Sequence, residues 1–136
     1  MFRLTAPSED DLRRFVSKQQ DSKFSYPEVG ASAATLPKRY NVDHNRIQLG
    51  SGRNTWERAV EATRAWTMFD ISWLRVFPTK APIQSGTTVA VCARHLGIYS
   101  LNACRIVYVV EEDGPVTRYG FAYGTLIEHA ERGEER

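Results

Sequence analysis

Hydrophobic and polar positions recur along this chain with two different periods, which separate helical segments from strands. Ser8 and Asp11 resemble a capping box, and apolar residues recur at helical spacing after them. A short amphipathic helix is therefore predicted from about Ser8 to about Gln20. A second helix is predicted from Trp56 to Phe69, because its apolar stripe lies opposite a face of acids and arginines. The intervening stretch is rich in Ser, Pro, Gly and Ala and is interpreted as a long surface excursion.

The period changes to two after Asp70, which is typical of strands. Four segments share this alternation or a β-branched, apolar composition: residues 71–77, 87–94, 103–111 and 116–126. A turn over residues 112–115 joins the last two, and residues 46–50 form a shorter strand candidate before a Gly-Ser-Gly turn. The sequence therefore predicts a single α+β domain, residues 1–136, in which two helices accompany a curved antiparallel sheet.

Composition and charge narrow the class of protein. The chain has 136 residues, 42% hydrophobic and 25% charged, and its net charge is only +2, with basic residues scattered among acids. These values are typical of a folded globular protein and give no strong signal for nucleic-acid binding. No apolar run approaches the roughly 20 residues of a membrane span. Because the first residues also lack a signal peptide's apolar region, a cytoplasmic protein without a membrane span is predicted.

The two cysteines, Cys92 and Cys104, are too few for a disulfide framework and lack the spacing of a zinc site. If a hairpin turns near Gly97, the two residues sit almost opposite each other on neighbouring strands. Because a reducing cytosol disfavours the bond, two buried thiols are favoured over a disulfide.

The last predicted strand has two unlike faces. The rings of Tyr119, Phe121 and Tyr123 fall on one face, and glycine and alanine fall on the other. The small face leaves room for a closely packed helix or for a ligand, although a β-bulge fits the glycines equally well. We therefore expect an inner hollow beside this strand.

Two places along the chain carry candidate chemistry. Arg105 interrupts an apolar strand face and needs a partner, for which an internal acid is favoured over a carboxylate ligand or contact with water. His129 lies near Glu134 and Glu135, a combination suited to acid–base chemistry, although such groups more often pin a turn. No metal or cofactor is expected, because the histidines are far apart and lack a metal-binding spacing.

The segment from Phe121 to Leu126, followed by His129 and Gly133-Glu134-Glu135, resembles the signature of an uncharacterised family, domain-of-unknown-function family nineteen-ninety of bacteria and plants. Upstream residues agree along nearly the whole chain, among them Tyr26 to Gly30, Trp66, Trp73, Asn102, Cys104 and Arg105. The resemblance implies no agreed activity. By analogy it implies a helix-grip fold of the START and birch-pollen-allergen type, in which a curved sheet surrounds a hydrophobic pocket.

One departure from that family concerns the end of the chain. Family members continue past the Gly-Glu-Glu signature through further strands and a long final helix, whereas this sequence ends at Arg136. The resemblance therefore implies that these C-terminal elements are lacking. We expect exposed apolar surface, an uncovered sheet edge, and weak stability or homo-oligomers formed through that edge.

Three functions remain open. The leading hypothesis is binding of a small hydrophobic or amphipathic molecule in a pocket between sheet and helix. Its predicted contacts are Trp66, Trp73, Arg105, Tyr108, Phe121 and Tyr123, although the two tryptophans are more often ordinary core residues. The second is an enzyme that uses His129 with Glu134 or Glu135 as acid and base. The third is a protein-interaction module that uses the exposed sheet edge.

Overall fold

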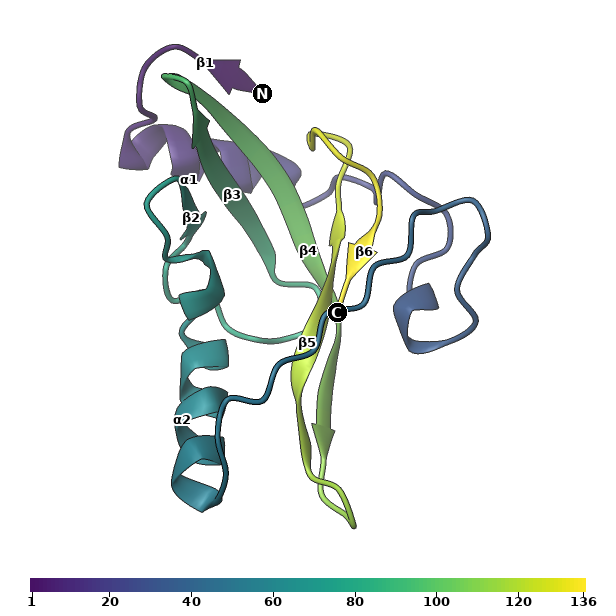
Figure 1. Cartoon of the computed structure of the whole chain (residues 1–136). Helices are drawn as coiled ribbons and strands as arrows, with labels where there is room; N and C mark the ends of the chain where they lie inside the picture. The colour runs from purple at the N-terminus through teal and green to yellow at the C-terminus, as the bar shows by residue number, and fades with distance from the viewer.

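A computed structural model describes residues 1–136 and shows one open antiparallel sheet with two helices (Figure 1). The strands of the main path, in spatial order, are β2 (Leu74–Phe77), β3 (Thr88–His95), β4 (Ile98–Glu112), β5 (Arg118–Thr125) and β6 (Glu134–Glu135). The remaining elements are β1 (Phe2–Arg3), which pairs with β4, the helices α1 (Glu9–Gln19) and α2 (Arg53–Arg64), and the 3-10 turns η1 (Ala31–Ala33) and η2 (Thr67–Phe69). The predicted α+β class with an antiparallel sheet and two helices is confirmed.

The β3–β4 hairpin turns tightly at Leu96 and Gly97, as predicted. Its register pairs Cys92 with Leu101 and Cys104 with Val89. The two cysteines are therefore three positions out of register, and they belong to different core clusters on opposite faces of the sheet. The expectation that they sit opposite each other is wrong, and both are free, buried thiols.

One face of the sheet is covered by α1 and is called the α1 face. The capping box that starts α1 is confirmed: the Asp11 N–H donates to Ser8 Oγ at 3.1 Å, and the Ser8 N–H donates to the Asp11 carboxylate at 3.0 Å. The apolar side of the helix packs on small and branched side chains of β3, β4 and the end of β5. The buried members of this cluster are Leu12, Phe15, Val16, Ala90, Cys92, Leu101, Ala103 and Leu126.

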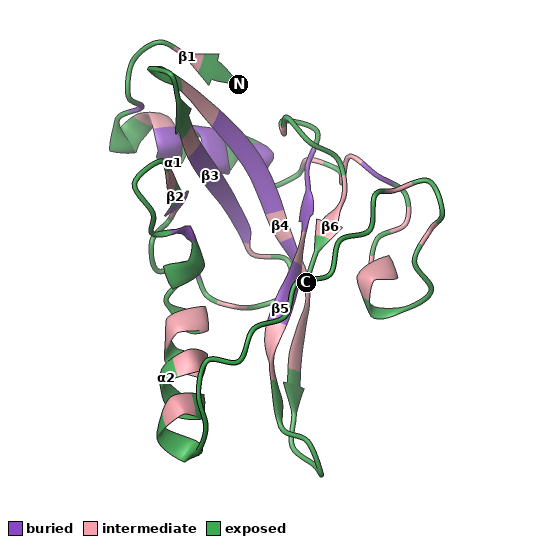
Figure 2. Ribbon diagram, viewed as in Figure 1, coloured by how far each residue is buried: buried purple, intermediate pink, exposed green.

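The opposite face, called the open face, is only partly covered. The predicted helix from Trp56 to Phe69 ends earlier, at Arg64, because Trp66 adopts a left-handed conformation with φ 57°. The chain then turns through η2, and Trp66 and Phe69 pack against β3, β4 and β5. Helix α2 itself buries no residue fully, and it lies beside the lower part of the β4–β5 hairpin (Figure 2).

Two strand predictions differ from the structure. Residues 46–50 are exposed and unpaired, because no neighbouring strand lies alongside to accept their backbone bonds. The strand predicted from Ile71 begins only at Leu74, since reciprocal backbone bonds between these two residues close a turn. Trp73 lies in that turn and is 54% exposed, so it is not part of a strand face.

The unlike faces of β5 are observed, but the small face is filled at Gly124. Phe121 and Tyr123 face the open side, and Ala122 and Gly124 face the α1 side. The ring of Tyr26 lies directly over Gly124, where an added Cβ would sit 2.0 Å from the phenol oxygen. The hollow expected on this side is therefore occupied by the protein's own side chain. At the outer edge, β6 pairs only with Tyr123 and Gly124, so residues 118–122 pair with β4 on one side and have no strand partner on the other.

Candidate functional site

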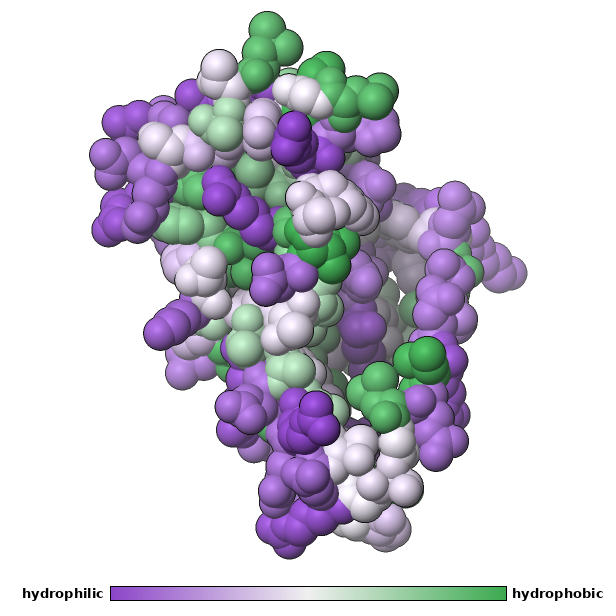
Figure 3. All heavy atoms as spheres, turned by 60° about the vertical axis from the view of Figure 1, so that its left-hand side comes forward, coloured by the Kyte–Doolittle hydropathy of each residue, from purple (hydrophilic) through white to green (hydrophobic).

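A half-open cavity of about 1140 Å³ lies on the open face, and it extends around the β6 edge of the sheet. Its floor is formed by side chains of β3, β4 and β5: Val91, Ala93, Ser100, Asn102, Cys104, Tyr123 and Thr125. Phe69, Trp73 and Leu74 form an apolar wall, and residues from the 36–45 and 129–136 segments complete the margin. In the view of Figure 3, hydrophobic side chains reach the surface at mid-height and the surface is hollowed beside them.

Residues 41–50 cross in front of the sheet on their way to α2 (Figure 1). Every residue of this segment is exposed, and no backbone hydrogen bond ties it to the rest of the chain. Its first part contributes to the cavity margin. No ladder of backbone bonds therefore fixes this part of the cavity margin.

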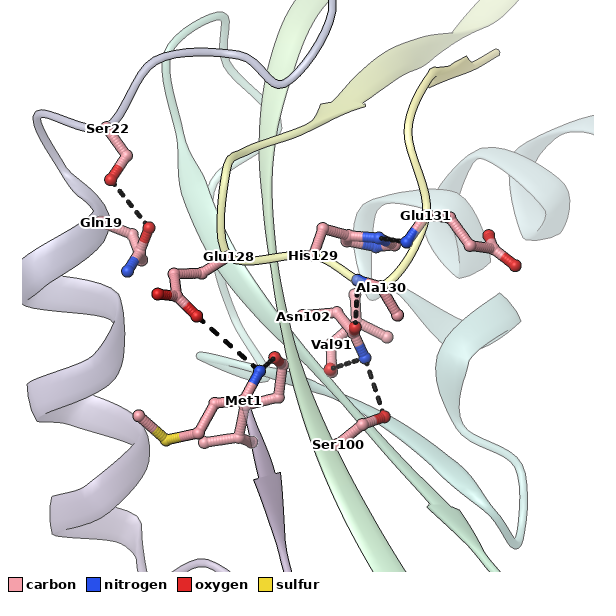
Figure 4. A network of polar contacts seen from close by, with 11 residues as sticks. Met1, Gln19, Ser22, Val91, Ser100, Asn102, Glu128, His129, Ala130 and Glu131 are labelled. Atoms are coloured by element: carbon pink, nitrogen blue, oxygen red, sulfur yellow. Dashed lines mark hydrogen bonds and ion pairs between the residues drawn. The ribbon is translucent and has the colours of Figure 1, made fainter. Parts of the chain in front are cut away.

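Asn102 fixes the loop after β5 against the cavity floor (Figure 4). Its side-chain amide donates to the Val91 carbonyl at 3.3 Å and to Ser100 Oγ at 3.0 Å, and its oxygen accepts from the Ala130 N–H at 3.1 Å. This buried amide has partners on both its nitrogen and its oxygen, so it serves as an anchor rather than as a free contact for a ligand. The anchor places His129 at the margin of the cavity.

The protonation of His129 follows from its surroundings. Its Nδ1 accepts a hydrogen bond from the Glu131 N–H at 2.9 Å, so the neutral ring carries its proton on Nε2 (Figure 4). Burial lowers the pKa of His129, and the nearby Glu131 charge opposes this only partly. The ring is therefore neutral at pH 7, and its Nε2–H has no partner within the protein.

Nearby carboxylates raise the pKa values of two residues in the cavity floor. The Tyr123 hydroxyl donates to the Glu135 carboxylate, and burial together with this contact raises the pKa of Tyr123. Burial, and to a lesser extent the charges of Glu135 and Glu131, raise the pKa of the Cys104 thiol to about 12. Both groups stay protonated at neutral pH, so Cys104 lacks the thiolate that a nucleophile or metal ligand needs.

Glu134 points the other way, because successive residues of a strand face opposite sides. Its carboxylate accepts from the Tyr26 hydroxyl at 2.7 Å, from the N–H groups of Gly30 and Ser32 at 2.7 and 3.0 Å, and from the Ser32 hydroxyl. Burial alone would raise the pKa of Glu134, but these bonds outweigh it and lower the pKa. The structure therefore does not bring Glu134 and His129 into contact; Glu134 ties η1 to β6.

Arg105 lies on the α1 face with all its contacts inside the protein. Its guanidinium donates to the carbonyls of Ser22, Gln19 and Gln20 at 2.8, 2.8 and 2.7 Å, and to Thr88 Oγ1 at 3.0 Å. The predicted acidic partner is wrong, because carbonyls at the C-terminal end of α1 take its place. The carbonyls of Gln19 and Gln20 lie at the end of the helix, where carbonyls lack partners within the helix and carry partial negative charge, so they suit a cation.

The six predicted ligand contacts thus fall in three places. Trp73 and Tyr123 line the cavity. Trp66 and Phe121 lie in the core of the open face, where the Trp66 indole donates to the Ala81 carbonyl at 2.9 Å. Arg105 and Tyr108 lie on the α1 face, and the Tyr108 hydroxyl bonds with the Ser32 hydroxyl at 2.6 Å. The sequence prediction missed Asn102, although an amide within an apolar strand was a usable signal.

Two further observations concern ions and membranes. Nowhere do three or more His, Cys, Asp or Glu side chains gather in a way that could hold a metal ion. Neither helix has both the length and the apolar character to cross a bilayer.

The open sheet, with one packed face and one cavity-bearing face, defines an α+β protein with two unlike surfaces. The chain belongs to the family described as domain of unknown function (DUF1990), whose model matches residues 25–136. The resemblance inferred from the last strand and its flanking residues is thereby confirmed.

Relatives from distant organisms are similar over the chain's length. A UPF0548 protein of Deinococcus radiodurans is 36% identical over all of this chain and 73% of its own length. A UPF0548 protein of Dictyostelium discoideum is 31% identical over all of the chain and 68% of its own length. One from Arabidopsis thaliana is 25% identical over 96% of the chain and 69% of its own length. No solved structure matches the chain, so the helix-grip analogy stays a prediction.

Proposed function

We propose that the cavity on the open face binds a small hydrophobic or amphipathic molecule. The observation that carries this proposal is a half-open space of about 1140 Å³ with an aromatic wall and a floor of mixed apolar and polar side chains. Small-molecule sites have about 300–1000 Å³ and combine such a lining with a few polar groups. The space is slightly larger than this range, so a drug-sized molecule would leave part of it open to water.

The residues that line the cavity form an apolar part and a polar part. Trp73 and Leu74 offer hydrophobic surface beside the Val91 floor, and burying such surface contributes about 25 cal/mol per Å². The Nε2–H of His129 supplies one hydrogen-bond donor without an internal partner. An occupant with an apolar body and one polar group fits this combination.

The test uses N-phenyl-1-naphthylamine, an uncharged fluorescent probe, with native mass spectrometry to detect any copurified molecule. Trp73→Ala should weaken probe binding about fivefold or more, since the variant removes part of the apolar wall. Trp73 is exposed, so its loss should leave the fold intact. Trp56→Ala is the matched control, because Trp56 is also exposed and lies on α2 outside the cavity lining.

Self-association through the uncovered part of β5 is the competing candidate. It predicts oligomers that grow with concentration and no specific effect of Trp73→Ala. Absence of saturable probe binding, or equal losses in the two tryptophan variants, would overturn the cavity proposal.

A further inference from the structure

The charges that line the cavity are unequal in number. Acidic side chains from three separate segments contribute five carboxylates: Glu28, Asp43, Glu131, Glu134 and Glu135. Only two guanidinium groups, those of Arg132 and Arg136, lie among the lining residues. Glu28 is paired with Arg39, whereas Glu131 and Glu135 form no ion pair. Glu134 is turned to the other side, where Tyr26, Gly30 and Ser32 donate to it, so the carboxylates without an ion pair at the margin are those of Asp43, Glu131 and Glu135. Three such carboxylates against two guanidinium groups leave a small excess of negative charge beside the space.

The influence of this charge extends to the cavity floor. After burial, the carboxylates of Glu135 and Glu131 are the groups that raise the pKa of both Cys104 and Tyr123. These two floor residues belong to different strands, β4 and β5. The negative charges of the two carboxylates therefore act on residues of both strands in the cavity floor, which an occupant would contact. A partly desolvated site of this kind strengthens the attraction for an opposite charge.

Aromatic rings line the same space. Phe69, Trp73 and Tyr123 border the apolar zone, and Tyr40 lies at the margin. The faces of such rings attract cations, and they bind quaternary ammonium groups in particular. The rings also accept an apolar body, so the aromatic wall and the acidic margin favour the same kind of occupant.

The residues that line the cavity do not suit a metal ion or an anion. A metal ion requires several donor groups that converge on one point, and no such group of three exists here. An anion would face the excess of carboxylates with His129 in its neutral form. We infer that the cavity selects an organic cation, an amine or ammonium group attached to an apolar body. This inference rests on the proposed function and specifies its ligand class.

The test compares three probes that share one ring system: 1-naphthylmethylamine, 1-naphthalenemethanol and 1-naphthylacetate, which are cationic, neutral and anionic at pH 7. Binding is measured by calorimetry at low and at high salt. The amine should bind about fivefold or more tightly than the alcohol, and the acetate more weakly than either. High salt should narrow the difference, because it screens charges at an open margin.

Glu131→Gln and Glu135→Gln should each weaken binding of the amine by about threefold or more while leaving the alcohol unchanged. Glu112→Gln is the matched control: it removes the same charge at the far end of β4, outside the cavity lining, and should change neither affinity. Equal affinities for the three probes, or a preference for the acetate, would overturn the cation inference while the binding function stands. Failure of all three probes to bind would overturn both.

Discussion

The two faces of this sheet differ in whether their charged and polar side chains have partners within the protein. On the α1 face, Arg105 satisfies its donors with internal oxygens, and Glu134 satisfies its acceptors with internal donors. On the open face, Glu131 has no ion-pair partner, and the Nε2–H of His129 has no acceptor within the protein. The comparison shows which polar groups have partners within the protein and which do not.

The covering elements explain this difference. Helix α1 lies against β3 and β4 and closes one face with its apolar side (Figure 2). Helix α2 ends at Arg64 and buries no residue fully, so only the turn with Trp66 and Phe69 covers the other face. The uncovered part of the open face is where the cavity lies.

The largest expected effect comes from removing the cation of the α1 face. Arg105→Ala leaves the carbonyls of Gln20 and Ser22 without a donor and the Gln19 carbonyl with only the Ser22 N–H, and we expect the free energy of unfolding to fall by about 3 kcal/mol. Urea denaturation measures this loss. Arg75→Ala is the matched control, since Arg75 is an exposed strand arginine without an internal partner, and it should change stability by less than about 0.5 kcal/mol.

Equal losses in the two arginine variants would show that the contacts of Arg105 do not stabilise the α1 face. Binding of the uncharged probe to folded Arg105→Ala should equal that of the unmodified protein, because Arg105 lies on the face away from the cavity floor.

Local signals in the sequence predicted the elements that depend on local contacts. The Ser8 capping box and the turn at Gly97 are set by residues close in sequence, and both were predicted correctly. The end of α2 was missed, because Trp66 adopts a left-handed conformation that favours glycine and carries no sequence signal here. Residues 46–50 have strand-like composition, but a strand also needs a partner that the sequence cannot supply locally.

The candidate site was predicted only in part, for a related reason. The alternation of β5 correctly placed Tyr123 on one face, but the partners of the charged residues lie far away along the chain. Arg105 meets carbonyls 83 to 86 residues earlier, and Glu134 meets donors 102 to 108 residues earlier. Such contacts depend on how the long excursion folds back over the sheet, which periodicity does not specify.

A second prediction compares two glycines on the same face of β5, one covered by a side chain and one not. Gly124→Ala places a methyl group against the Tyr26 ring, so that ring must move and its bond to Glu134 is disturbed; we expect a loss of about 2 kcal/mol. Gly120→Ala adds the same group on the same strand face, with nothing within 4 Å. It should not lower the melting temperature. A similar drop for both variants would contradict the packing of Tyr26 over the strand.

The smallest expected effect concerns acid. Because the folded-state pKa of Glu134 lies below its ordinary value, its ionised form stabilises the fold above that ordinary value, and this contribution is lost as the pH falls through the folded-state pKa. Glu134→Gln should cost about 1 kcal/mol at pH 7 and should lose less stability than the unmodified protein between pH 6 and pH 3. Urea titrations across this range measure both quantities.

Asp11 also has a lowered pKa, through its bonds to Ser8, but it shares no partner with Glu134. Asp11→Asn should therefore reduce the loss of stability in acid independently of Glu134→Gln, and the two effects should add. An unchanged acid response in Glu134→Gln would mean that the donors from Tyr26, Gly30 and Ser32 do not hold an ionised carboxylate, and the contrast between the two faces would lose its electrostatic basis.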